Sequence, residues 1–354
     1  MASKFRVGFI GCGRPWRTEG STGFGMAYAH AGGYKKLDDC ELAACADISE
    51  TNAKAFAEAN GVPAMYTDYN EMLAKEKLDI VSICTWPHLH AQMVIDTARA
   101  GVKAIHCEKP MAPTWGESHR MARFCEERGV QLTFNHQRRF LEPFQRAKKM
   151  LTDGVIGELK RIEGACADIF DWGTHWLDMF FFYNNETPVE WVIGQIDSRR
   201  EHRVFGVPLE NQAICDFRFA NGVRALLFTG AGSDVGFANR LLGTKGVIEL
   251  HWDQPVLRVM TESEAGWRIV ETKEGLHDGV AIDRAVADLV DALKTGREPE
   301  LSARRALRAT EVIFATYESS RRRGRVDMPL DVDDSAFLTM LEAGEIGPGA
   351  SRKR

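Results

Sequence analysis

The chain has 354 residues, a length that suits two domains or one large one. Its 45 Lys and Arg against 50 Asp and Glu give a net charge of −5, which lacks the basic excess of nucleic-acid-binding proteins and polybasic membrane patches. With 44% hydrophobic and 27% charged residues, wholesale disorder is excluded. No apolar run has the length of a signal-peptide core or approaches the roughly 18 residues of a membrane span, so we expect a cytoplasmic protein.

The eight cysteines stand singly, without a C-x-x-C pair. Several of them lie in apolar, strand-like runs, which favours reduced core thiols over a disulfide framework or a zinc site. His88 and His90 form a close histidine pair, but no acidic or thiolate residue stands at ligand spacing from them. We therefore expect no metal.

The first part of the chain alternates short apolar runs with amphipathic stretches. Ser49 and Gly61 are typical of the start and end of a helix between them. Apolar strands without alternation need cover on both faces, which indicates βαβ crossovers and a parallel sheet. Residues 1–134 are therefore predicted to form a doubly wound α/β domain with strands at 7–10, 42–46, 79–84 and 103–107 and helices at 25–37, 49–60, 69–77 and 90–100.

The pattern changes after about residue 134, where strands follow one another closely and favour antiparallel pairing. Residues 135–335 are predicted to form an α+β domain, with a helix at 142–151 and strands at 159–167, 189–198, 212–219, 223–229, 239–243 and 246–251. An apolar helical face runs from Ile282 to Leu293, and Ser302 caps a second helix that ends near Ser320. Residues 336–354 are predicted to be a C-terminal tail, disordered over 347–354.

A glycine turn follows the first strand directly. Gly11 and Gly13 permit a tight turn whose backbone N–H groups approach a pyrophosphate. Trp16 stands where the third glycine of a G-x-G-x-x-G motif would be. Gly25 takes the role of that third glycine if nine residues are inserted within Arg14–Thr22. The alternative is an ordinary turn that binds nothing.

Asp47 stands at the carboxyl end of the second strand, where a carboxylate accepts hydrogen bonds from the adenosine ribose. This carboxylate would repel a 2′-phosphate, and Ile48 and Ser49 supply no arginine to receive one. The sequence therefore predicts NAD rather than NADP, with Arg14 and Arg17 as the residues that would overturn this preference.

Two polar motifs stand out in apolar surroundings. Glu108-Lys109-Pro110 ends a parallel strand, at the edge where doubly wound sheets bind ligands. If the segment from Asp171 is helical, Asp171, His175 and Asp178 share one face, and a carboxylate one turn from an imidazole suits general acid–base chemistry. The alternative is a surface lysine, a capping aspartate and a core histidine.

Together these residues resemble one family. The resemblance rests on Gly11-Cys12-Gly13, Asp47, Thr85 to His90, Glu108-Lys109-Pro110, Arg138-Arg139-Phe140, Asp171 to His175, and the closing Glu318 to Leu330. In this order they are similar to the Gfo/Idh/MocA (glucose-fructose oxidoreductase / inositol dehydrogenase) family. This implies a Rossmann domain, a C-terminal α+β domain whose large open sheet often mediates homodimers or tetramers, a nicotinamide cofactor, and a sugar, cyclitol or glycoside substrate.

The resemblance also implies residue roles. Lys109, His175 and Asp171 would be catalytic, and Pro110 would follow a cis peptide bond. Substrate would be bound by Lys109, Arg139, Asp171 and His175. The NAD-binding residues would be Gly11, Gly13, Gly25, Asp47, Thr85, His90, Glu108 and Lys109.

Two departures from the family pattern affect the active site. Where many members read T-P-N-x-x-H, this chain reads Thr85-Trp86-Pro87-His88-Leu89-His90, which changes the packing on the nicotinamide side. The inserted loop Arg14–Thr22 would emerge beside the pyrophosphate. It either covers the active site, reaches a neighbouring subunit, or is a solvated decoration.

Three functions follow from this sequence. The leading hypothesis is an NAD-dependent dehydrogenase that oxidises a secondary hydroxyl of a sugar-like molecule. The second hypothesis is an NAD-dependent glycosidase or oxidoisomerase, in which the cofactor oxidises the substrate only transiently and the hydride returns after elimination or isomerisation. The third, from another class, is a catalytically silent cofactor-binding regulatory protein, against which the joint presence of Lys109, Asp171 and His175 argues.

Overall fold

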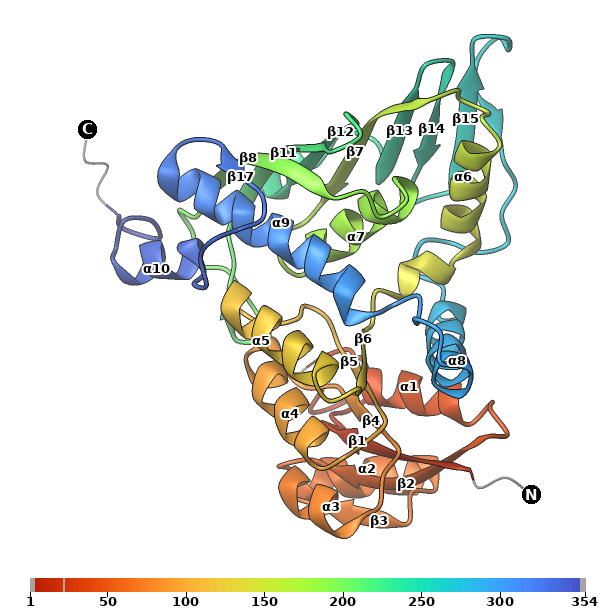
Figure 1. Cartoon of the computed structure of the whole chain (residues 1–354), viewed down its shortest axis with the longest axis vertical. Helices are drawn as coiled ribbons and strands as arrows, with labels where there is room; N and C mark the ends of the chain where they lie inside the picture. The colour runs from red at the N-terminus through yellow and green to blue at the C-terminus, as the bar shows by residue number, and fades with distance from the viewer. Residues whose placement is uncertain (1–3, 22, 351–354) are drawn as a thin grey trace. The chain divides into compact units, whose positions relative to one another are not determined.

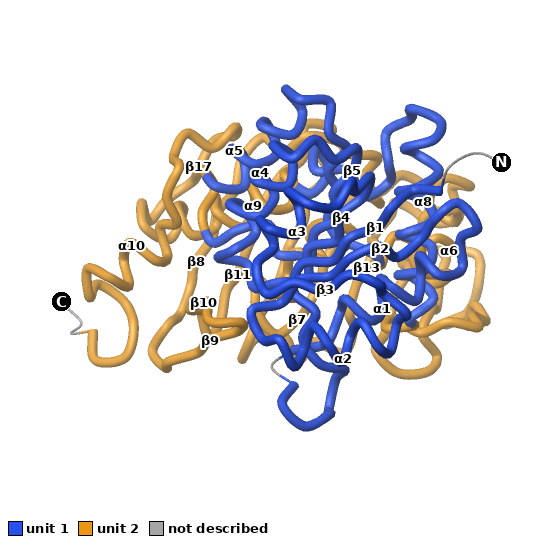
Figure 2. Tube along the Cα trace, turned by 90° about the horizontal axis from the view of Figure 1, so that it is seen from below, with its two compact units in different colours: residues 1–113, 117–137, 279–306 blue, residues 114–116, 138–278, 307–354 orange. Residues whose placement is uncertain are grey.

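The structure is a computed structural model that describes residues 4–21 and 23–350 (Figure 1). The chain divides into two compact units (Figure 2). Unit 1 takes residues 1–113, 117–137 and 279–306, and unit 2 takes residues 114–116, 138–278 and 307–354. The segment 279–306 therefore packs with the N-terminal part of the chain, although the sequence places it within 135–335. The sequence boundaries at 134 and 335 stay a prediction.

Unit 1 contains a six-stranded parallel sheet in the order β3-β2-β1-β4-β5-β6. Its strands are β1 Phe5–Ile10, β2 Cys40–Ala46, β3 Ala64–Tyr66, β4 Ile80–Ile83, β5 Ala104–Cys107 and β6 Gln131–Phe134. The strand order runs outward from β1 and β4 in opposite directions, which makes a ligand-binding crevice at their carboxyl ends. The predicted doubly wound fold is confirmed, and β3 and β6 are additions to it.

Within the described residues of unit 1, five helices lie between these strands in the chain, and a sixth comes from the later segment 279–306. They are α1 Met26–Tyr34, α2 Glu50–Asn60, α3 Tyr69–Lys75, α4 Pro87–Arg99, α5 Trp115–Glu126 and α8 Val280–Thr295. Ser49 caps α2 by accepting a hydrogen bond from the Asn52 amide, and Gly61 ends the helix with a φ of 69°. The helix α4 begins at Pro87 and not at His90 as predicted, because proline suits the first helical turn, where no amide is needed.

The helix α8 packs against α1. Gly33 on α1 allows this approach, since a Cβ there would lie 3.2 Å from Val286. Val286, Leu289 and Val290 join the buried cluster that contains Phe9 of β1. The apolar face of α8 was visible in the sequence, but an apolar stripe does not specify which element covers it.

Unit 2 contains a nine-stranded sheet in the order β16-β15-β14-β13-β7-β12-β11-β8-β17. Its strands are β7 Leu159–Cys166, β8 Val189–Asp197, β11 Gln212–Phe219, β12 Arg224–Thr229, β13 Asn239–Gly243, β14 Gly246–Leu250, β15 Leu257–Thr261, β16 Arg268–Ile269 and β17 Val326–Asp327. The pair β7 and β12 is parallel, and the other neighbours are antiparallel. The predicted, mostly antiparallel sheet is confirmed. A separate ribbon pairs β9 Arg203–Val204 with β10 Val207–Pro208.

The remaining elements are helical: η1 Gln137–Phe140, α6 Glu142–Thr152, α7 Gly173–Tyr183, η2 Gly230–Gly232, α9 Ala303–Arg322 and α10 Ala336–Glu342. The helix α7 packs on β7 and β12. Along β11, side chains alternate between buried and exposed positions, so this sheet has one covered and one open face.

The predicted tail is partly ordered. The helix α10 lies within it, capped by the Ser335 side chain, which accepts a hydrogen bond from the Leu338 amide. Ala350 donates a hydrogen bond to Gly347, so residues 347–350 form a turn where disorder was predicted. Residues 351–354 lie outside the described part of the chain.

The eight cysteines are free thiols, and all except Cys84 are buried, in agreement with the predicted core role. Across residues 4–21 and 23–350, no helix is long and apolar enough to cross a membrane. Within the same residues, no group of three His, Cys, Asp or Glu side chains could hold a metal ion.

Candidate active site

The turn after β1 requires glycine. Gly11 and Gly13 have φ angles of 83° and 58°, and a Cβ on Gly11 would lie only 2.6 Å from Cγ2 of Thr85. The Asp47 carboxylate organises the turn: its Oδ2 accepts hydrogen bonds of 2.9 Å from the amides of both Cys12 and Gly13. Its Oδ1 accepts a bond of 2.8 Å from the Ser49 amide.

These residues fit a dinucleotide. The glycines leave room for the backbone to approach a diphosphate, and Asp47 holds a negative charge at the carboxyl end of β2, where a ribose would lie. Gly25 precedes α1 with a φ of 64°. A Cβ on Gly25 would lie 2.4 Å from the Arg14 carbonyl oxygen, so glycine is needed there because the inserted loop passes so close.

The inserted loop is anchored at both ends. Arg14 Nε donates a 2.9 Å hydrogen bond to Asn52 on α2. The rings of Trp16 and Phe24 pack against each other with centroids 4.6 Å apart and planes inclined by 34°, and both remain half-exposed. Thr22 lies outside the described residues.

Glu108 is buried at the end of β5 within a polar network. Its Oε1 lies 2.9 Å from Nε2 of His30 and 2.7 Å from Nδ2 of Asn135. Burial raises the pKa of Glu108, but the hydrogen bond and charge of His30, then Asn135 and Lys109, outweigh it and lower that pKa to about 2. Glu108 is thus an ionised carboxylate beside Lys109.

Lys109 is half-buried and precedes Pro110 through a cis peptide bond, as predicted. His90 supports this turn. Its Nδ1 lies 2.9 Å from the Pro110 carbonyl oxygen, and its Nε2 lies 3.1 Å from that of Thr85. Burial lowers the pKa of His90, and its neutral ring can donate a hydrogen bond to one of these two carbonyl oxygens. The predicted cofactor residues Thr85, His90, Glu108 and Lys109 are thus brought together in unit 1.

In unit 2 the helix α7 begins at Gly173, so the condition considered from the sequence, a helix that runs from Asp171, is not met. Asp171 lies in the preceding turn, where the Asp168 carboxylate accepts hydrogen bonds from the amides of Asp171 and Trp172. The short polar side chain of Asp168 competes successfully for these amides. His175 lies in the first turn of α7, buried like Asp171.

Asp168 lies in a buried acidic pair with Glu210. Burial, followed by the charges of Glu210 and Asp171, raises the pKa of Asp168 to about 7. Burial also raises the pKa of Glu210, which accepts hydrogen bonds from the Ile169 amide at 2.6 Å and the Tyr317 hydroxyl at 2.8 Å. The loop before α7 is therefore held by two buried carboxyl groups that accept hydrogen bonds from its backbone amides.

Arg139, predicted to bind substrate, is fully buried and paired with carboxylates. Its Nε and Nη2 each lie 2.8 Å from an oxygen of Asp178 on α7, and its Nη1 contacts Glu186. This bidentate pair fixes η1 to α7, because breaking it would leave a buried charge at a cost of about 3–5 kcal/mol. Asp178 is therefore turned towards Arg139.

The sequence analysis did not identify His30, Asn135, Asp168 or Glu210 as supports of the motifs. All four are buried polar residues, but only His30 lies in a helix or strand, so no periodic pattern marks the other three. Their partners lie 27 or more residues away, apart from those of Asp168, so no local spacing reveals the networks.

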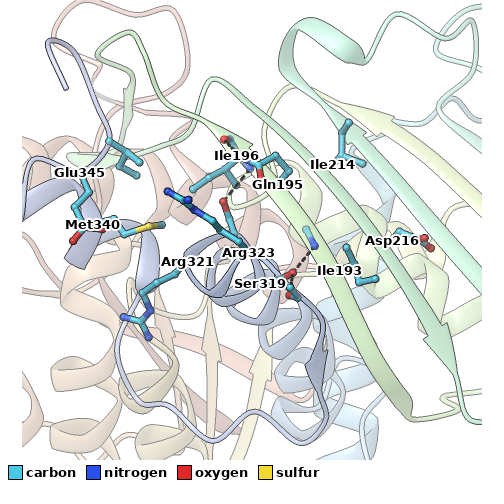
Figure 3. A pocket seen from close by; sticks show the side chains of 14 residues that line it. Ile193, Gln195, Ile196, Ile214, Asp216, Ser319, Arg321, Arg323, Met340 and Glu345 are labelled. Atoms are coloured by element: carbon cyan, nitrogen blue, oxygen red, sulfur yellow. Dashed lines mark hydrogen bonds between the residues drawn. The ribbon is translucent and has the colours of Figure 1, made fainter. Parts of the chain in front are cut away.

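A cavity of about 570 Å³ lies elsewhere in unit 2, between β8, β11, the end of α9 and the segment around α10 (Figure 3). Ile193 and Ile214 line it together with Arg321 and Met340. Its lining includes none of the candidate catalytic or substrate-binding residues.

The fold and the turn after β1 define an NAD-binding oxidoreductase with a Rossmann unit. Residues 5–136 match the oxidoreductase family, NAD-binding Rossmann fold, and residues 169–328 match its C-terminal alpha/beta domain. The chain belongs to the Gfo/Idh/MocA family.

Among its relatives, D-apiose dehydrogenase of Paraburkholderia graminis is 25% identical, with 97% of this chain and 95% of that protein covered. Inositol 2-dehydrogenase of Rhizobium meliloti is also 25% identical, with 91% and 99% covered. A solved structure of levoglucosan dehydrogenase in complex with NADH and levoglucosan has a TM-score of 0.79 at 21% identity, with 93% of this chain and 100% of that chain covered.

Proposed function

We propose that this enzyme oxidises a secondary hydroxyl of a sugar, cyclitol or glycoside by hydride transfer to NAD. The observation that carries the proposal is Lys109 at the carboxyl end of β5, beside the ionised carboxylate of Glu108 and within the unit that fits the dinucleotide. The names of two relatives as sugar and inositol dehydrogenases support the substrate class.

In this proposal each residue has one role. His175 accepts the hydroxyl proton, Lys109 stabilises the developing alkoxide, and Asp171 binds a neighbouring substrate hydroxyl. Bound NAD supplies the hydride acceptor. Gly11, Gly13, Gly25, Asp47, Thr85, His90 and Glu108 form the binding region of NAD.

Arg139 acts through Asp178, since its guanidinium is already paired with that carboxylate. It is a positioning residue for α7 and thereby for His175. This assigns the predicted substrate-binding arginine an indirect part in the reaction.

The test is NADH formation over a panel of aldoses, cyclitols and glycosides, with the product identified by mass spectrometry. We expect a product two hydrogens lighter than the substrate and one NADH per product. A product that forms without net NADH would instead favour transient redox chemistry. Saturable NAD binding without turnover of any compound would favour a regulatory protein.

We further propose that the protein is cytoplasmic and forms a homo-oligomer through the open face of the nine-stranded sheet. Exposed apolar side chains on this face, Ile193 and Ile214, support an interface between copies. The substrate is a small carbohydrate, and we expect neither nucleic-acid nor membrane partners.

A further inference from the structure

An aromatic cluster in unit 2 adjoins the turn that carries Asp171. Trp172, next to Asp171, packs edge-on against Trp252 and His277, with ring centroids 5.7 Å and 5.5 Å away. Trp252 and His277 stack with centroids 5.3 Å apart and planes inclined by 14°. The sequence analysis singled out neither Trp252 nor His277, which lie in loops that follow β14 and precede α8.

Part of this cluster faces solvent. Trp252 is 39% exposed, and His277 is also exposed, whereas Trp176 beneath them is fully buried. Large exposed aromatic surfaces that adjoin a candidate active site are typical of ligand contacts, because burying them on binding releases water.

The cluster is built over a buried cation. The guanidinium carbon of Arg138 lies 4.7 Å from the ring centre of Trp176, 5.6 Å from that of Trp172 and 5.9 Å from that of Trp252. Within the described residues no carboxylate lies at ion-pair distance from Arg138, and its Nε has no hydrogen-bond partner. The three indole rings therefore stabilise this charge together with the negative charge of Asp171.

Arg138 also fixes the protonation of His277. Its Nη2 lies 3.5 Å from Nδ1 of His277, and a guanidinium can only donate, so Nδ1 is the acceptor and the ring proton is on Nε2. Burial, followed by the charge of Arg138, lowers the pKa of His277 to about 4. At neutral pH the cluster thus offers aromatic faces and one uncharged N–H donor.

We propose that Trp172, Trp252 and His277 form a subsite for the non-reacting ring of a glycoside. The apolar C–H face of a pyranose ring or a phenyl aglycone packs on the indole, and Nε2–H of His277 donates to a ring hydroxyl. The cluster contains three aromatic side chains and begins at Trp172, next to Asp171. A substrate bound by Asp171 can therefore extend onto the aromatic cluster. This inference rests on the proposed function and narrows the substrate to glycosides larger than a monosaccharide.

Kinetics on matched compounds test the subsite. Glucose and galactose are compared with their phenyl glycosides and with cellobiose and lactose, in the wild type, Trp252→Ala and Trp267→Ala. Trp267 is the matched control, since it is 38% exposed in the same unit and its ring packs under Arg258, whereas the cluster is built over Arg138. We expect the wild type and Trp267→Ala to prefer glycosides by about tenfold in kcat/KM, and Trp252→Ala to lose this preference through KM.

A binding measurement makes the result independent of turnover. In the presence of NAD, the same glycosides should change the intrinsic tryptophan fluorescence saturably in the wild type and in Trp267→Ala, but not in Trp252→Ala. His277→Phe keeps an aromatic ring and removes the donor, so it should weaken binding several-fold.

The outcomes separate the two proposals. A saturable fluorescence change without NADH formation supports the subsite and refutes the dehydrogenase. NADH formation with the glycoside preference intact in Trp252→Ala, or a wild type that prefers free sugars, refutes the subsite and leaves the dehydrogenase. Absence of both signals refutes both.

Discussion

Lys109 and His175 are the residues whose removal should separate chemistry from binding. His175→Ala and Lys109→Ala should each lower kcat by at least about 10²-fold, the lower end of general-base assistance. NADH affinity, measured by fluorescence, should stay within a few-fold, since neither residue contacts the adenosine half. Asp171→Asn should raise KM more than it lowers kcat, because it contributes to ground-state binding.

Lys103→Ala provides the control for this pair. Lys103 precedes β5 at the opposite end of the strand, where it is exposed and pairs with Asp79 at 2.7 Å. Its removal should leave kcat unchanged. Near-normal turnover of His175→Ala on a verified substrate would show that the segment around α7 is structural.

Asp47 should decide the cofactor preference. Its carboxylate is held in place by three backbone amides, so its charge cannot turn away from a 2′-phosphate. The wild type should therefore prefer NAD, and Asp47→Asn, which removes the charge and keeps one of the two acceptor oxygens, should raise kcat/KM for NADP relative to NAD by about tenfold.

The nearby Arg14 is the residue that could reverse this preference, because its side chain already lies against Asn52 on α2. Arg14→Ala should leave the cofactor ratio unchanged. An NADP preference in the wild type that disappears in Arg14→Ala would show that this arginine receives the 2′-phosphate.

Asp168 should make the stability of the protein depend on pH. Its folded pKa, about 7, lies above its unfolded value of 3.8, so its contribution to stability is fully present below pH 3.8 and is lost as pH rises through 7. Between these limits the loss should amount to roughly 1–4 kcal/mol in the free energy of unfolding.

Denaturant unfolding from pH 4 to 8 measures this effect. Asp168→Asn keeps an acceptor for the amides of Asp171 and Trp172, so it should fold and lack this part of the pH dependence. Asp234→Asn, at an exposed site in the same unit, should follow the wild type. Identical pH profiles for the wild type and Asp168→Asn would contradict the raised pKa.

At the scale of elements, the inserted loop is the feature most specific to this chain. Its Trp16 packs against Phe24, which follows the loop, and the guanidinium of Arg17 lies 5.8 Å from the Trp16 ring centre. Replacing residues 15–21 with a short glycine linker should raise KM for NAD or for substrate several-fold, because half-exposed aromatic groups next to a binding turn are available to cover a ligand.

This variant keeps the hydrogen bond from Arg14 to Asn52, so its melting temperature should change little. Unchanged KM values for both ligands would mean that the loop is a decoration or an oligomer contact. Replacing Trp16 alone with alanine distinguishes the aromatic contribution from that of loop length.

The sequence predicted elements well where a local signal sets their ends. Ser49 and Gly61 bound α2 as expected, because a hydroxyl cap and a left-handed glycine act within a few residues. The short strands β3 and β6 were missed, since three or four residues carry too little periodicity to identify them. A helix from Asp171 was considered from the sequence, but α7 begins at Gly173, after a turn in which the amides of Asp171 and Trp172 donate to Asp168.

At the scale of the whole molecule, the open face of the nine-stranded sheet predicts self-association. Ile193 and Ile214 are 45% and 42% exposed on neighbouring strands, which is costly for a sheet that stays alone in water. The double change Ile193→Glu and Ile214→Glu should dissociate the oligomer into monomers, as measured by light scattering after size-exclusion chromatography.

Arg218→Ala is a suitable control, since it removes an exposed charge from the same strand, β11, while its partner Glu190 stays solvated. It should keep the oligomeric state of the wild type. A monomeric wild type would refute the interface without affecting the proposed chemistry.

The sequence by itself determined the two fold classes, the glycine turn with Asp47, and the motifs around Lys109 and His175. These features depend on periodicity and on residues close together in the chain, so one sequence is sufficient to read them. The family match and the cis Lys109–Pro110 bond agree with that reading.

Only the tertiary structure decided which distant residues support these motifs. It placed α8 in unit 1, His30 and Asn135 on Glu108, Glu210 near Asp168, and Trp252 and His277 over Arg138. Each of these contacts forms because a buried charge or an apolar face requires a partner. The sequence offers many residues that could serve as that partner and does not distinguish among them. Which partner is used depends on the packing of the whole chain, and that choice fixes the ionisation of Glu108, the tautomer of His277 and the aromatic surface beside Asp171.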